Sequence, residues 1–315
     1  MRPTISIIAF TVLSGAGYGL LFLLGLGIAT GQLPAYDVIP LLVGGLLVSA
    51  GLSASVGHLG KPLRAWRAFS QWRSSWLSRE GVVALLTYLP LLALMSLHLP
   101  CADTCAGFPA ALPGAVLLAL GCVATVYCTA HIYSSLKPIR AWSNGFTLPA
   151  YLLLGLYSGA LWLLAIDWPR SRGIANEDAT QWLWVATALI IAPACALLKW
   201  RYWRWLDAGT GAADAGSATG LDRLGTVRSF EQPHTEENYL THEMGFVLAR
   251  RHSRRLRAIA LWLIVLAPPA MLPLVTLLGG PAAWLALSAG MAGIFVERWL
   301  FFAEAKHAVM AYYGR

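Results

Sequence analysis

Ionisable side chains gather at the ends of apolar stretches in this sequence. His58 ends one apolar run, Glu80 opens the next, Arg64 lies between them, and Arg298 lies near the end of the last run. An imidazole exchanges a proton near neutral pH, and a carboxylate relays protons. A positively charged guanidinium stabilises negative charge on a neighbouring group. A quinone that reacts at a membrane edge needs such groups around its carbonyl oxygens. Polar groups at these span ends are therefore functional candidates, and a quinone is one ligand that they could serve.

Long apolar segments must position these groups. The chain has 315 residues, of which 57% are hydrophobic and 12% are charged, whereas soluble domains carry about 25% charged residues. This composition excludes a soluble enzyme, a nucleic-acid-binding module and a disordered scaffold. Each segment supplies the ~20 apolar residues of a membrane-spanning helix, without the alternation of a barrel strand. We expect an all-α integral membrane protein with eight transmembrane helices in two bundles, over residues 4–30, 36–57, 81–97, 112–133, 147–166, 180–199, 258–278 and 281–302.

Three glycines mark the first of these segments. Gly15, Gly17 and Gly19 occupy alternate positions in its middle. Small residues let membrane helices approach each other closely, which predicts a packing face. Glycine is also simply tolerated in membrane helices, and the sequence leaves both interpretations open.

The connections between the spans differ sharply in basic residues. Of the 23 lysines and arginines, 21 lie in the even-numbered connections or near the two ends of the chain. The positive-inside rule then places both termini and the connections 59–80, 134–146 and 206–257 in the cytoplasm. Residues 1–205 hold the first six spans, 206–257 form a cytoplasmic linker and partner-docking segment, and 258–315 hold the last two spans and the tail.

The sequence supplies no redox centre of its own. His58 and His131 lie on the same side and could bracket a haem iron, but a transmembrane di-haem protein needs four histidines at two depths, so we expect no haem. The sequence has no iron–sulfur cysteine pattern and no phosphate-binding loop, and we expect no metal site. His58 could also end a helix, and Glu80 could face a helix dipole. Electron chemistry must then involve a partner protein or a lipid-soluble carrier.

Basic residues on the cytoplasmic connections predict a docking surface for a protein partner. The motif KPLRAW at 61–66 recurs as KPIRAW at 137–142, by duplication or by chance. The segment 206–257 begins as a flexible linker and ends in a basic helix-like run that suits a partner or the lipid surface. The residues expected to dock the partner are Lys61, Arg67, Arg73, Lys137, Arg140, Arg250 and Arg251.

Three stretches of the chain resemble the membrane-anchor subunits of the dimethyl sulfoxide (DMSO) reductase family. They are HLGKPLRAW at 58–66, SWLSRE at 75–80 and ERWLFF at 297–302, and the number of spans agrees along the whole chain. The resemblance implies an eight-helix anchor without haem, which docks an iron–sulfur subunit that exchanges electrons with a molybdopterin subunit. It also implies a bound quinone, ubiquinone or menaquinone, with His58, Arg64 and Glu80 as its binding residues and Arg298 as an addition.

The chain departs from the DMSO reductase anchor in two features. It has the long connection 206–257, and its charge distribution places residues 58–80 on the cytoplasmic face, whereas a reductase with exported catalytic subunits docks on the opposite face. The sequence therefore looks more like the anchor of the sulfite dehydrogenase complex, whose catalytic subunits are cytoplasmic. This resemblance implies a multi-pass protein of the bacterial inner membrane that passes electrons from sulfite oxidation to quinone.

Three other functions stay open at this point. The first is a quinol-oxidising anchor of a DMSO or polysulfide-type reductase. The second is a transporter. Charges at the midplane of the membrane would support that interpretation, whereas the charges here lie at the edge. The third is a passive anchor whose polar cluster serves only as an interface, and such an anchor would give no response to quinone.

Overall fold

Long helices make up the protein. The computed structural model describes residues 3–33, 37–57, 59, 61–97, 108–168, 177–209, 214–228, 230–231 and 248–313, and every regular element within these ranges is helical. A helix satisfies its backbone polar groups internally, which is what a long apolar run requires in lipid. Among the described residues, seven helices are long and apolar enough to cross a membrane: α1 (Ile5–Ala29), α2 (Val38–Gly57), α3 (Trp76–Ser96), α4 (Phe108–Ser134), α5 (Thr147–Asp167), α6 (Glu177–Asp207) and α11 (Gly280–Ala303).

The expected span at 258–278 is helical but irregular. It consists of the end of α9 (Leu248–Leu261), the π-helical turn η4 (Trp262–Leu266) and α10 (Ala267–Leu278). Pro268 has no N–H to donate to the carbonyl of Ile264, so the regular hydrogen bond is lost there. The Tyr157 hydroxyl of α5 donates to that carbonyl instead, at 2.5 Å. None of the three pieces is long enough alone to cross a bilayer, and the count of eight spans stays a prediction.

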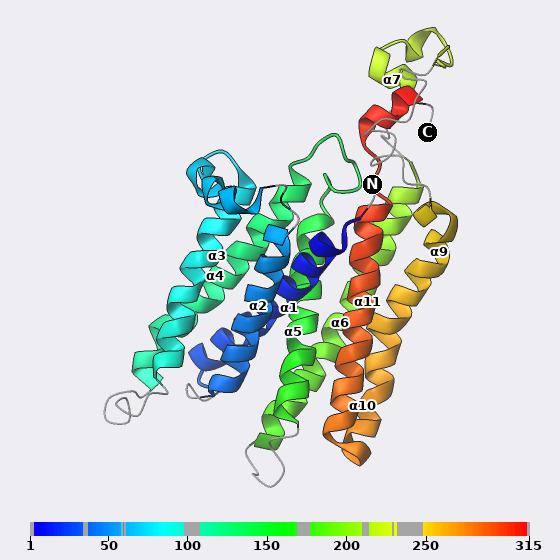
Figure 1. Ribbon diagram of the computed structural model, residues 1–315. Coiled ribbons are helices and arrows are strands. Elements are labelled where there is room, and N and C mark those ends of the chain that lie inside the picture. The colour runs from blue at the N-terminus through cyan, green and yellow to red at the C-terminus, as the bar shows by residue number, and fades with distance from the viewer. Residues whose placement is uncertain are drawn as a thin grey trace.

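The helices α1 and α5 form the centre of the molecule. The helix α1 packs against α2, α4 and α5. The helix α5 packs against α1, α4, α6 and α11. Figure 1 shows α2, α3 and α4 on one side of this centre, and α6, α9, α10 and α11 on the other. Because neighbours cover them from both sides, α1 and α5 are the most buried of the seven spans.

Small residues let α1 cross α5 at close range. A Cβ atom on Gly19 would overlap the carbonyl oxygen of Gly155, and one on Gly159 would overlap the backbone of Gly19. Gly17 faces α2 instead, whereas a Cβ on Gly15 would meet nothing within 4 Å. The three glycines of α1 therefore do not share one packing face, because two of them meet different helices and the third has open space beside it.

The connections predicted to share one face of the membrane lie at one end of the bundle. Figure 1 shows the start of α1, the 3-10 helix η1 (Pro62–Gln71), the short helix α7 (Ala215–Thr219) and η5 (Ala308–Tyr313) at that end. The connection from α10 to α11 lies at the opposite end. The described connections named here thus lie at the ends that the charge pattern predicts, and the assignment of one end to the cytoplasm stays a prediction.

Two helices extend into the segment expected to be a linker. The helix α6 continues to Asp207 rather than ending at 199, and α9 begins at Leu248. The extension of α6 is packed, because Tyr202 and Trp203 are buried against Ala260 of α9 and Leu300 of α11. Between these helices the structure describes 208–209, 214–228 and 230–231, including α7 and the 3-10 turn η3 (Asp222–Leu224).

Candidate functional site

Glu80 lies inside α3 and faces α4. The helix begins at Trp76, before the expected start at 81, so Glu80 lies beyond the first turn, where the influence of the helix dipole fades. Its side chain is buried, and the equally buried Thr129 of α4 donates a hydrogen bond to its carboxylate. An ionisable group is costly at membrane depth, which makes Glu80 a functional candidate.

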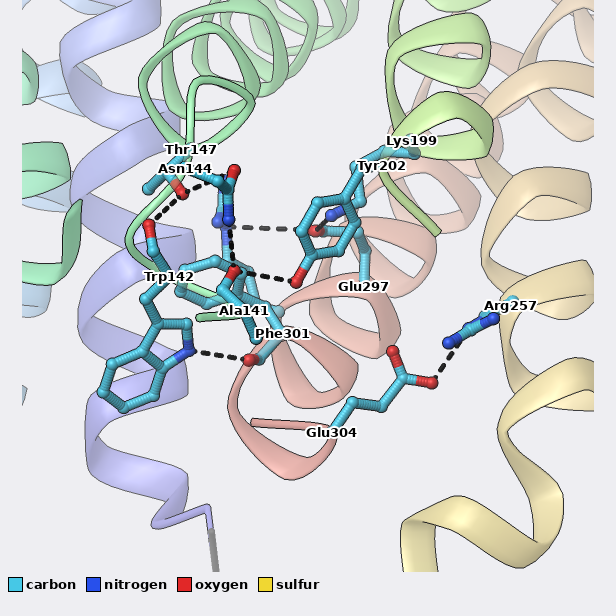
Figure 2. Close-up of polar contacts among 11 residues, drawn as sticks. Ala141, Trp142, Asn144, Thr147, Lys199, Tyr202, Arg257, Glu297, Phe301 and Glu304 are labelled. Carbon is cyan, nitrogen blue, oxygen red and sulfur yellow. Dashed lines mark hydrogen bonds and ion pairs between the residues drawn. The ribbon is translucent and has the colours of Figure 1, made fainter. Parts of the chain in front are cut away.

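A second buried charged cluster joins α6 to α11. The Nζ atom of Lys199 lies 2.6 Å from Oε1 of Glu297, and Nε of Arg298 lies 3.4 Å from Oε2 of the same carboxylate. Figure 2 shows the Lys199–Glu297 pair between the two helices. All three side chains are at most 3% exposed. Two cations thus share one carboxylate, and the cluster has excess positive charge in apolar surroundings.

Glu80 and Arg298 contribute to one buried polar layer. The Arg298 guanidinium lies 3.8 Å from the ring centre of Tyr151 on α5, and that ring stacks on Tyr133 of α4, with 5.9 Å between their centres. Thr129, the hydrogen-bond partner of Glu80, lies one helical turn before Tyr133 on α4, so the two side chains share a face of that helix. We define the polar layer as Glu80, Thr129, Tyr133, Tyr151 and Arg298. Its carboxyl and phenol groups can exchange protons, and its guanidinium can stabilise negative charge on a bound molecule.

The other two residues expected in the site are not in this layer. Arg64 lies in η1, where its side chain is exposed at the end of the bundle. His58 lies outside the described residues. Of the four expected residues, the structure therefore brings Glu80 and Arg298 into the same layer.

Further ion pairs connect the buried cluster to the surface. Arg257 of α9 donates to Glu304 at 2.9 Å and to Asp207 at 2.7 Å, and Figure 2 shows the contact with Glu304. Burial raises the pKa of the Glu304 carboxyl, while the Arg257 guanidinium beside it favours the charged form and limits the rise. These pairs hold α9 against α6 and α11, so we interpret them as structural.

The residues expected to dock a partner differ in exposure. Four of them are exposed at the same end of the bundle: Lys61, Arg67, Arg73 and Lys137. Arg140 is half-buried, because its guanidinium stacks 4.1 Å from the ring centre of Trp205 and donates to the Trp205 carbonyl at 3.3 Å. The side chains of Arg250 and Arg251 lie outside the described residues. Arg140 is therefore tied to the end of α6.

The two copies of the repeated motif have opposite environments. In the second copy Ile139 and Trp142 are buried, and the Trp142 indole donates to the carbonyl of Phe301 at 2.9 Å, as Figure 2 shows. In the first copy the equivalent Leu63 and Trp66 are 93% and 65% exposed. The end of α11 thus covers the second copy, whereas the apolar side chains of the first copy lie open to a partner.

His131, the second histidine of the haem alternative, packs among aromatic rings. Its ring lies 4.0 Å from that of Tyr127 and 4.7 Å from that of Trp76, measured between ring centres. Its Nδ1 atom lies 2.9 Å from the Tyr127 carbonyl oxygen. Within the described ranges no three His, Cys, Asp or Glu side chains gather as they would around a metal ion.

Several residues of the site could not be found from the sequence alone. Tyr133 and Tyr151 carry no distinctive signal, because tyrosines near span ends are also typical of interfacial belts. Lys199 looks in the sequence like one more basic residue at the start of a connection. Tyr202 and Trp203 follow Lys199 by three and four positions, so the three side chains share a helix face. This spacing could have indicated that Lys199 lies among aromatic rings rather than in a loop.

The chain is similar to known proteins over nearly its whole length. A family model described as the DMSO reductase anchor subunit matches residues 1–303. The chain is 32% identical, over an alignment 335 positions long, to a sulfite dehydrogenase subunit of Allochromatium vinosum, and the alignment covers 99% of each chain. No solved structure matches the chain.

Proposed function

The chain belongs to the DMSO reductase anchor subunit family, and from this membership we propose that it is the quinone-binding anchor of a molybdopterin and iron–sulfur oxidoreductase in the bacterial inner membrane. The observation that carries the proposal is the buried polar layer, which holds Glu80 and Arg298 among membrane-spanning helices. Ionisable groups persist at such depth where they serve a function. An anchor that only docked its partners would need no such layer.

The donors of the polar layer fit a quinone. The Nη1 atom of Arg298 is buried and makes no hydrogen bond to any described residue. A quinone has carbonyl oxygens that accept such bonds, and it takes up two electrons and two protons to become a quinol. Arg298 would hold negative charge that develops on the oxygens. Glu80 would deliver a proton, and Arg64 and His58 would complete the site from the docked face.

We propose that the electrons come from sulfite. The name of the Allochromatium vinosum relative supports this direction. A molybdopterin partner would supply the oxidation of sulfite with water to sulfate, which releases two protons and two electrons, and an iron–sulfur partner would pass the electrons to the quinone. The family's description supports a second candidate, a quinol-oxidising anchor of a DMSO or polysulfide-type reductase. Assaying the purified complex for sulfite-dependent quinone reduction and for quinol-dependent sulfoxide reduction distinguishes the two.

We expect Glu80→Gln to lower quinone-linked turnover of the purified complex by about 10²-fold, as for the loss of a general acid or base. Glutamine keeps the shape of the side chain and can still accept the Thr129 hydrogen bond, but it cannot carry a proton. Sulfite-dependent reduction of a short-chain quinone measures the effect. Sulfite oxidation with a soluble electron acceptor should not change, because that reaction bypasses the anchor.

Asp222→Asn serves as the control for this change. Asp222 is an exposed carboxylate in η3, and its replacement removes one negative charge without touching the polar layer. We expect turnover of this variant to equal that of the wild type. Unchanged quinone reduction by the Glu80→Gln complex would contradict the role proposed for Glu80.

We propose that the iron–sulfur subunit docks on η1, on the cytoplasmic face. Exposed arginines alternate there with exposed aromatic rings, and Arg67 lies 5.6 Å from the ring centre of Trp66. Interface cores are enriched in tryptophan and arginine. The second copy of the motif offers a model for this contact, because the indole N–H of Trp142 donates to a backbone carbonyl at the end of α11. We expect Trp66 to make the same kind of contact with the partner. Lys61, Arg73 and Lys137 would add electrostatic attraction for an acidic partner.

We expect Trp66→Ala to weaken retention of the iron–sulfur subunit by about 30-fold, as for a tryptophan at the centre of an interface. Affinity purification of the complex, with quantification of the partner, measures the loss. Leu224→Ala is the matched control, because Leu224 is 86% exposed on η3, away from η1. Equal partner retention by both variants would place the docking surface elsewhere.

A further inference from the structure

An open pocket of about 530 Å³ lies beside the end of α6. Within the described residues its lining consists of Trp200, Arg201 and Arg204 of α6 and of Phe146, the residue before α5. The Arg204 guanidinium lies 4.7 Å from the ring centre of Trp200. Phe146 packs against Tyr202 of α6, with 6.1 Å between their ring centres. The pocket therefore combines two guanidinium groups with aromatic walls.

The two arginines of this pocket have no acidic partner in the described part of the chain. The ion pairs of that part involve neither Arg201 nor Arg204, and both side chains are exposed. Arg140 adds a third positive charge at the end of α6, where its guanidinium stacks on Trp205. An anionic ligand therefore complements the pocket. Guanidinium groups suit a phosphate in particular, because their N–H donors match its oxygens in pairs.

The pocket continues an exposed stripe along one face of α6. Ile190, Leu197 and Trp200 are 72%, 54% and 47% exposed. Arg201 and Arg204 follow at the spacing of three and four positions that keeps residues on the same helix face. The order along this membrane-spanning helix is thus aliphatic, then tryptophan, then arginine. Tryptophan is typical of the headgroup level and arginine reaches into the polar region, so the stripe matches a phospholipid from its acyl chains to its phosphate.

We propose that this pocket binds the headgroup phosphate of an anionic phospholipid from the surrounding bilayer. Arg201 and Arg204 donate to the phosphate, the Trp200 ring lies at the level of the glycerol, and an acyl chain lies along Leu197. Basic pockets at the ends of membrane helices recognise lipid headgroups in this way. A zwitterionic headgroup fits less well, because its ammonium group is repelled by the two arginines. The aliphatic part of the stripe favours a lipid over an acidic segment of a protein partner.

Lipid binding to the purified complex tests the proposal. Native mass spectrometry measures the first lipid bound during titration with phosphatidylglycerol, and with phosphatidylcholine that has the same acyl chains. We expect the wild type to bind phosphatidylglycerol about 10-fold more tightly than phosphatidylcholine. Arg201→Gln and Arg204→Gln should each weaken phosphatidylglycerol binding about 5-fold, and the double variant about 30-fold, as for basic residues beside an anionic lipid. Binding of phosphatidylcholine should not weaken.

Arg255→Gln separates the pocket from the general positive charge of this end of the bundle. Arg255 is exposed on α9, two positions before Arg257, which contacts Asp207 at the end of α6. It lies outside the lining of the pocket. The variant loses the same charge as Arg204→Gln, and its binding of phosphatidylglycerol should equal that of the wild type.

Three results would overturn the proposal. Equal weakening by Arg255→Gln and Arg204→Gln would mean that the lipid responds only to the overall charge. Full displacement of the lipid by inorganic phosphate would make the pocket a site for a free anion. Loss of a partner subunit from the double variant, with unchanged binding of phosphatidylglycerol, would assign the two arginines to protein docking.

Discussion

The Gly19→Ala variant is expected to unfold at a much lower temperature than the wild-type protein. The added methyl group would overlap the carbonyl oxygen of Gly155, and this contact is with backbone rather than with a flexible side chain. The central helices α1 and α5 would have to separate, which loosens the packing of every helix around them. Overpacking costs about 1–3 kcal/mol and occasionally more, and we expect a value at or above the upper end. Thermal unfolding of the purified full chain in detergent measures the effect.

Gly15→Ala provides the comparison for this variant. Gly15 lies one turn earlier on the same helix, and its added methyl group would meet nothing within 4 Å. Alanine is favoured over glycine within helices, so this change should leave the unfolding temperature equal or slightly higher. Equal destabilisation by the two variants would mean that α1 and α5 do not cross at Gly19.

The middle of each membrane helix could be predicted from the sequence, because a continuous apolar run has few alternatives in lipid. The span expected at 4–30 is α1 (Ile5–Ala29), and the one expected at 147–166 is α5 (Thr147–Asp167). The ends of α3 and α6 could not be predicted in the same way. Tryptophan, arginine and serine at those ends are typical of a loop, and tertiary packing makes them helical.

The site was predictable by residue type but not by arrangement. Glu80 and Arg298 are candidates because ionisable groups beside a membrane core are rare. Their common layer depends on how α3, α4, α5 and α11 are rotated against one another, and a single sequence does not carry that information. The repeated motif illustrates the same limit, because Phe301, which covers its second copy, lies 159 residues beyond Trp142.

The buried cluster implies the other large effect. We expect Glu297→Gln to destabilise the protein by about 3–5 kcal/mol, the range for removing one partner of a buried ion pair. Glu297 lies between two cations, so its replacement leaves both Lys199 and Arg298 without a counter-charge in apolar surroundings. Unfolding of the full chain by denaturant in mixed micelles measures the loss.

Lys199→Met should be milder than Glu297→Gln, because Glu297 keeps Arg298 as its partner when the lysine is gone. The double variant should be more stable than the sum of the two losses predicts, since it leaves one cation rather than two unpaired. Asp207→Asn is the surface control, with an expected change within about 1 kcal/mol, because the Asp207 side chain is 59% exposed. Equal losses for Glu297→Gln and Lys199→Met would mean that Arg298 does not depend on the carboxylate. In that case Arg298 would hold its place over Tyr151 through the aromatic contact alone.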